Sequence, residues 1–90
     1  MYAVVVKATL HDSEKATAFL REQVIPNVGQ APGFVGAQWV RIGGNRGTSM
    51  LTFETEEGAR AMAEQLKTDP PPADAVPIDS AEIGEVVERI

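Results

Sequence analysis

Three side chains in this sequence have the chemistry to hold or transform a small molecule. Trp39 and Arg41 lie two residues apart in an apolar run, so in a β-strand they share one face of the sheet. An indole can stack on a flat ligand, and a guanidinium can bind a carboxylate or a phenolate. Tryptophan and arginine are also frequent anchors of protein interfaces. For Trp39 we expect an interface or packing role ahead of ligand contact.

The third candidate is His11, the only imidazole of the chain. It could move a proton near neutral pH, although an exposed residue before a helix start is the simpler interpretation. No nucleophile–base pair can be inferred around it, so a catalytic triad is not indicated. Glu54, Glu56 and Glu57 cluster where a helix is predicted to begin, which the helix dipole explains better than a divalent ion does. We therefore expect no metal site.

The composition of the chain argues against some kinds of binding partner. The chain has 90 residues, 43% of them hydrophobic, with no cysteine and a net charge of -5. This size predicts one domain over residues 1–90 with a genuine core. The few basic residues are scattered, which argues against nucleic-acid binding. No apolar run approaches the ~20 residues that cross a bilayer, and no signal peptide precedes the first strand, so we expect a cytoplasmic protein without membrane contact.

The predicted elements alternate as βαββαβ. In chain order they cover residues 2–8, 12–28, 34–42, 48–54, 55–67 and 78–90. Pro26 is expected to bend the first helix near Ile25, the glycine-rich segment 43–47 to form a hairpin, and the last strand to break or bulge at Gly84. This order predicts an α+β, ferredoxin-like domain. Its antiparallel four-stranded sheet should have the order 4-1-3-2, with both helices on one face.

The first strand, Tyr2 to Ala8, is a continuous apolar run with one lysine, which is typical of a strand covered on both faces. Two helices can cover only one of these faces. We expect a second copy of the chain to cover the other, giving a homodimer packed sheet to sheet. Half a dozen side chains burying ~80–100 Å² each would contribute roughly 12–15 kcal/mol of gross transfer free energy before the costs of association.

Two longer runs, Pro32 to Arg41 and Met50 to Ala59, flank the glycine-rich hairpin. Together they resemble the antibiotic-biosynthesis-monooxygenase-like group of dimeric α+β barrel proteins, and the resemblance covers nearly the whole chain. It implies a small dimeric protein that binds or oxidises a small aromatic or apolar molecule without metal or flavin. Many members of the group have no assigned activity. The alternative is a non-catalytic dimeric module for protein interaction or stress response.

The haem-degrading branch of that superfamily carries an Asn on the first strand, a Trp at the end of the third strand and a His on the second helix. Here the first strand has no Asn, the second helix has no His, and Phe53 stands at the Trp position. Phe53 thus joins Trp39, His11 and Arg41 as a candidate ligand contact. The departures imply that iron lacks its axial donor, and we expect no haem and no other cofactor.

Overall fold

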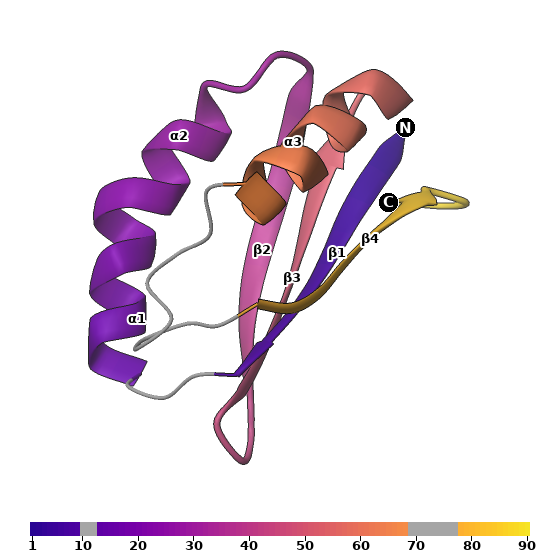
Figure 1. Cartoon of the computed structure of the whole chain (residues 1–90). Coiled ribbons are helices and arrows are strands. Elements are labelled where there is room, and N and C mark those ends of the chain that lie inside the picture. Colours follow the sequence, from indigo (N-terminus) through magenta and orange to yellow (C-terminus); the bar gives the residue numbers. More distant parts are fainter. Residues whose placement is uncertain (10–12, 69–77) are drawn as a thin grey trace.

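The computed structural model describes residues 1–9, 13–68 and 78–90. Strands β1 (Tyr2–Thr9), β2 (Phe34–Ile42), β3 (Arg46–Phe53) and β4 (Ile78–Glu85) form one antiparallel sheet in the order β2-β3-β1-β4. The helices pack on one face of this sheet (Figure 1). The predicted element order, strand order and ferredoxin-like α+β fold are confirmed.

The first helical stretch contains a widened turn. It consists of α1 (Ser13–Phe19), the π-helical segment η1 (Leu20–Val24) and α2 (Ile25–Gly29). The backbone N–H of Ile25 donates to the carbonyl of Leu20, five residues earlier. Pro26 follows without an N–H, and its ring crowds the carbonyl one turn before it, so the helix widens there. The disturbance predicted near Ile25 is therefore present as a π-helical turn. The predicted helix start at residue 12 lies outside the described residues.

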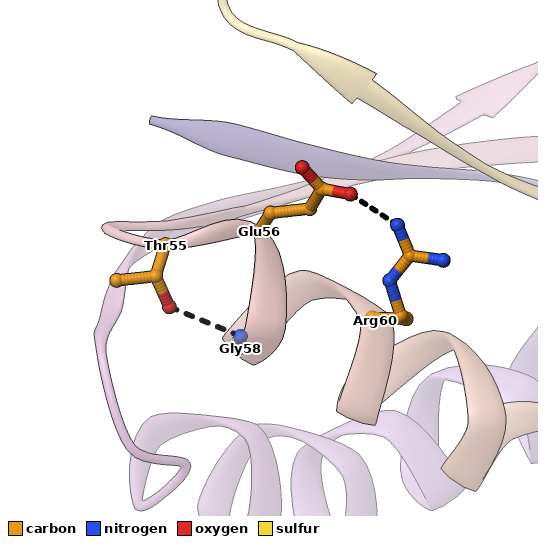
Figure 2. A network of polar contacts seen from close by, with 4 residues as sticks. All are labelled: Thr55, Glu56, Gly58 and Arg60. Atoms are coloured by element: carbon orange, nitrogen blue, oxygen red, sulfur yellow. Dashed lines mark hydrogen bonds and ion pairs between the residues drawn. The ribbon is translucent and has the colours of Figure 1, made fainter.

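Helix α3 (Glu56–Thr68) begins at a side-chain cap. The backbone N–H of Gly58 donates to Oγ1 of Thr55 at 3.1 Å, and Glu56 pairs with Arg60 one turn later (Figure 2). A capping hydroxyl satisfies one of the backbone N–H groups that have no partner within the helix. This contact fixes the point at which the chain leaves β3 and enters α3.

Removing this cap should destabilise the fold modestly. We expect Thr55→Ala to lower the free energy of unfolding by about 1 kcal/mol, the usual cost of losing a capping hydroxyl. Thr55→Ser keeps the acceptor and is the matched control, with a smaller loss expected. Urea unfolding of the three proteins measures both values. Equal losses for Ala and Ser would show that the methyl group of Thr55, and not its hydroxyl, matters.

The core lies between the sheet and the helices. Its largest fully buried side chains are Phe53, Leu51 and Val4. Phe53 meets Phe34 edge to face, with ring centroids 5.9 Å apart and an interplanar angle of 69°. Gly58 allows α3 to approach this pair, because a Cβ atom there would lie 3.4 Å from the Phe53 side chain and closer still to backbone. This half of the domain is tightly filled.

Two irregularities in the sheet differ from the sequence-based expectation. Strand β4 ends at Glu85, and its register shift lies at Asp79, between the pairs made by Ile78 and Ser80. The predicted break at Gly84 is wrong, because Gly84 pairs regularly with Ala3. Asp79 accepts a hydrogen bond of 2.9 Å from the Thr9 hydroxyl. The bulge of β4 thus lies at Asp79, whose carboxylate accepts a side-chain hydrogen bond, and not at the glycine of this strand.

A second shift falls at Val35 in β2, where Phe34 and Gly36 pair with successive residues of β3. As a result Phe34, and not Val35, packs against the core. The predicted hairpin is confirmed, but its turn is shorter than expected. Gly43, Gly44 and Asn45 form it, and β3 begins at Arg46. Gly44 and Asn45 both adopt positive φ, which glycine and asparagine tolerate best.

The sheet face away from the helices is called here the open face. It exposes Val40, Ile42 and Met50, each more than 40% accessible. Lys7 and Glu82 lie on the same face and are exposed. The predicted apolar character of this face is therefore present on β2 and β3 and is interrupted by charge on β1 and β4. Among the described helices, none is long and apolar enough to cross a membrane.

Candidate functional site

A cleft of about 690 Å³ lies between the first helical stretch and the sheet. One wall comes from α1, η1 and α2, which lie beside β2 in Figure 1. The floor comes from β1 and β3, β2 forms a second wall, and α3 contributes Met62, Gln65 and Leu66 at one side. Most of the lining is apolar, with a small number of polar groups, which is typical of small-molecule sites.

The cleft exists because small side chains form this part of the floor. Ala8 and Gly47 pair with each other, and Val6 pairs with Ser49 one step further along. None of these residues reaches far above the sheet, and the facing helix contributes Ala16 at 7% exposure. The opposite half of the same layer is filled by large side chains. The space between sheet and helices is therefore filled beside the aromatic core residues and open beside the small residues Ala, Gly and Ser.

Trp39 lies on the wall of this cleft. It points to the helix side of β2, where it is half-buried and packs against the core cluster. The open face of β2 carries its neighbours Gln38 and Val40 instead. Trp39 therefore does not lie on the face where a sheet-to-sheet interface is expected. It packs against the core cluster and also lines the cleft, so its position is compatible with the expected packing role and with ligand contact.

Arg41 shares this face with Trp39, as the spacing predicted, and also lines the cleft. Ala37 points the same way, whereas Val35 lies at the bulge and does not pack on the core. Arg41 is exposed and pairs across the sheet with Gly47. Arg41 therefore lies at an end of the cleft where the neighbouring floor residue, Gly47, has no side chain.

Arg21 is a lining residue that the sequence analysis missed. It lies in η1, three residues before Val24 and seven before the buried Val28. Its helical spacing from these core residues was the one indication in the sequence that Arg21 faces the sheet. The spacing alone could not place it, because the π-helical turn changes which residues face the sheet.

Only one of the other two candidates can be placed. His11 lies outside the described residues. Phe53 is fully buried in the core beside Phe34 and does not line the cleft. Within residues 1–9, 13–68 and 78–90, no group of three or more His, Cys, Asp or Glu residues could hold a metal ion. The described polar lining consists of arginines, amides and hydroxyls.

Comparison with known proteins identifies relatives in fold. No protein-family model matches the chain, and no curated protein matches it. Among solved structures, a variant of MhuD with two manganese protoporphyrin IX molecules bound per active site is similar over 100% of this chain and 98% of its own, with 18% identity and a TM-score of 0.70. The fold is ferredoxin-like.

Two further solved structures share this fold over nearly their whole length. A dimeric ferredoxin-like protein from an uncultured marine organism has 12% identity and a TM-score of 0.61, covering 100% of this chain and 98% of that one. The heme-degrading protein Rv3592 from Mycobacterium tuberculosis has 24% identity and a TM-score of 0.54, covering 100% and 99%. At these identities the likeness establishes the architecture, and function has to be argued from the residues of the site.

Proposed function

We propose that this protein is a homodimer of the monooxygenase-like group that binds a small, flat, largely apolar molecule in the helix–sheet cleft. The observation that carries the proposal is the position of Trp39 and Arg41 on one wall of a cleft of about 690 Å³ with an apolar lining. A large aromatic face beside a fixed charge can orient such a molecule. The resemblance of the sequence to that group points to the same kind of ligand.

The homodimer rests on the open face. Val40, Ile42 and Met50 form an exposed apolar patch on adjacent strands, and a second copy can cover it sheet to sheet. One of the solved structures with this fold is described as dimeric. In such an arrangement the cleft stays on the outer, helical side of each sheet. Assembly and ligand binding then use opposite faces and can be tested separately.

The lining residues do not fit a haem iron. Among the described residues that line the cleft, none is His, Cys or Tyr, and the only sulfur belongs to Met62. Met62 is 5% exposed and packs in the core cluster, so its sulfur is committed to packing. The porphyrin-binding and heme-degrading activities of two proteins with this fold are therefore not proposed for this chain.

The described lining also offers no general acid or base. It contains no His, Asp, Glu, Cys or Tyr, and arginine keeps its proton in proteins. This observation favours the second candidate function, a dimeric module that binds without catalysing. A reaction that the bound molecule carries out with oxygen by itself needs no such group. Oxygen uptake by the ligand-saturated protein separates the two functions.

Binding can be tested with anthracenecarboxylate, a flat fluorescent probe whose anisotropy rises when it is bound. We expect saturable binding, accompanied by energy transfer from Trp39, the only tryptophan of the chain. Trp39→Ala should weaken binding about tenfold, because an aromatic contact contributes ≈ 0.5–1.5 kcal/mol beyond its buried area.

Gln38→Ala is the matched control for this experiment, since it truncates the neighbouring side chain on the opposite face of the same strand. It should leave the probe's dissociation constant unchanged. Absence of saturable binding by the parent protein would refute the proposed cleft function. Equal weakening by both variants would place the probe elsewhere or indicate damage to β2 as a whole.

A further inference from the structure

The arginines of this protein divide into two groups. Three of them have partners among the described residues: Arg46 with the carbonyl of Gly43, Arg60 with Glu56, and Arg89 with the sulfur of Met1. Arg21 and Arg41 have no hydrogen-bond or ion-pair partner within the described part of the chain. Both line the cleft. The two arginines without a described partner are thus the two that face the candidate site.

The charge of the described lining has one sign. Arg21 and Arg41 contribute positive charge, and no described Asp or Glu lines the cleft, although the whole chain carries a net charge of -5. Apolar walls reduce the local dielectric and strengthen the field that these groups produce in the cleft. Such a site attracts an anion in preference to a neutral molecule of the same shape.

The positions of the charges match the position of the indole. Arg41 follows Trp39 by two residues on the same strand face, so their Cα atoms are roughly 6.6 Å apart. Arg21 stands on the facing helical wall. Side chains on a helix lean towards its N-terminus, and α1 lies beside the hairpin end of β2 (Figure 1). By this rule we expect Arg21 to lean towards the end of the cleft that contains Arg41.

We propose that the ligand is an aromatic carboxylate, with its ring system against Trp39 and its carboxylate held by Arg41 and Arg21. This inference rests on the proposed binding function and adds the charge of the ligand to it. Guanidinium groups present paired N–H donors that match the two oxygens of a carboxylate. Gly47 and Ala8 form the floor beside Arg41, and they leave room for the group between the two arginines.

The test compares anthracenecarboxylate with anthracenemethanol, which has the same ring system and no charge. Anisotropy titrations at low ionic strength should show at least tenfold tighter binding of the acid. Arg41→Gln should reduce this preference several-fold, and the double variant with Arg21→Gln should abolish it. Arg41→Lys should retain part of the preference, because it keeps the charge and loses the fork geometry. Added salt should weaken binding of the acid and leave the alcohol unaffected.

Arg46→Gln is the matched control. It removes one positive charge from the same hairpin at a residue that does not line the cleft, and it should keep the full preference. Urea midpoints equal to that of the parent protein establish that each variant is folded. Equal binding of acid and alcohol, or a preference that survives loss of both Arg21 and Arg41, overturns the anion assignment while cleft binding stands. Failure of both probes to bind refutes the proposed function itself.

Discussion

Replacing Met50 by glutamate should convert the proposed dimer into a monomer. Met50 lies on the open face in β3, between Val5 and Gln38 on the neighbouring strands, and is 43% exposed in the single chain. A carboxylate buried there without a partner costs several kcal/mol. Glu82, in the same row across β1, adds like charge nearby. We expect the dimer dissociation constant to rise at least a hundredfold, about 2.7 kcal/mol.

Sedimentation equilibrium at micromolar concentration measures this change. Ala61→Glu is the control, because Ala61 is exposed on α3, on the other side of the molecule from the open face. It introduces the same charge and should leave association unaffected. A Met50→Glu protein that associates as tightly as the parent would show that assembly does not use the open face. A well-folded monomeric parent would rule out the homodimer altogether.

Phe53→Ala should cause the largest loss of stability among single truncations in the core. Phe53 is fully buried, packs edge to face on Phe34 and lies beneath α3 at Gly58. Truncation of a buried phenylalanine typically costs 3–5 kcal/mol, a large share of the 5–15 kcal/mol that stabilises a typical domain. We expect the urea midpoint to fall sharply, or the variant to be unfolded without denaturant.

Phe53→Leu keeps most of the volume and should remain folded, so it makes the comparison measurable. The same variant decides between two roles of Phe53. A core residue should affect stability and leave the dissociation constant of the anthracene probe nearly unchanged. A leucine variant with parental stability and weakened probe binding would restore Phe53 as a ligand contact, against its position in this structure.

The sequence allowed the sheet to be predicted closely, because strand-forming residues, turn glycines and helix starts all indicated the same order. It predicted that Trp39 and Arg41 share a face, since spacing determines that much. It could not determine which face, because both faces of the strand carry apolar residues and the usual contrast between core and solvent is absent. For this reason the sequence could not separate an interface role of Trp39 from a packing role.

The position of the cleft within the helix–sheet layer was beyond prediction from one sequence. Its floor is defined by the absence of large side chains at Ala8, Gly47 and Ser49, and these residues become neighbours only through strand pairing. The bulges at Val35 and Asp79 were missed for a related reason. Each one adds a residue relative to a partner strand, which periodicity within a single strand does not reveal.

The π-helical turn has a consequence for how this fold can vary between related chains. A π-helical turn holds more residues than an α-helical turn, so the widened turn takes up the surplus residue within Leu20–Val24, and α1 and α2 keep their faces towards the sheet. Deleting one residue there should restore a regular α-helical turn, keep Val28 in the core and α1 on the sheet, and change only the side chains that Leu20–Val24 presents to the cleft. A one-residue difference in length could therefore change the ligand preference of a descendant while its sheet and assembly surface stay intact.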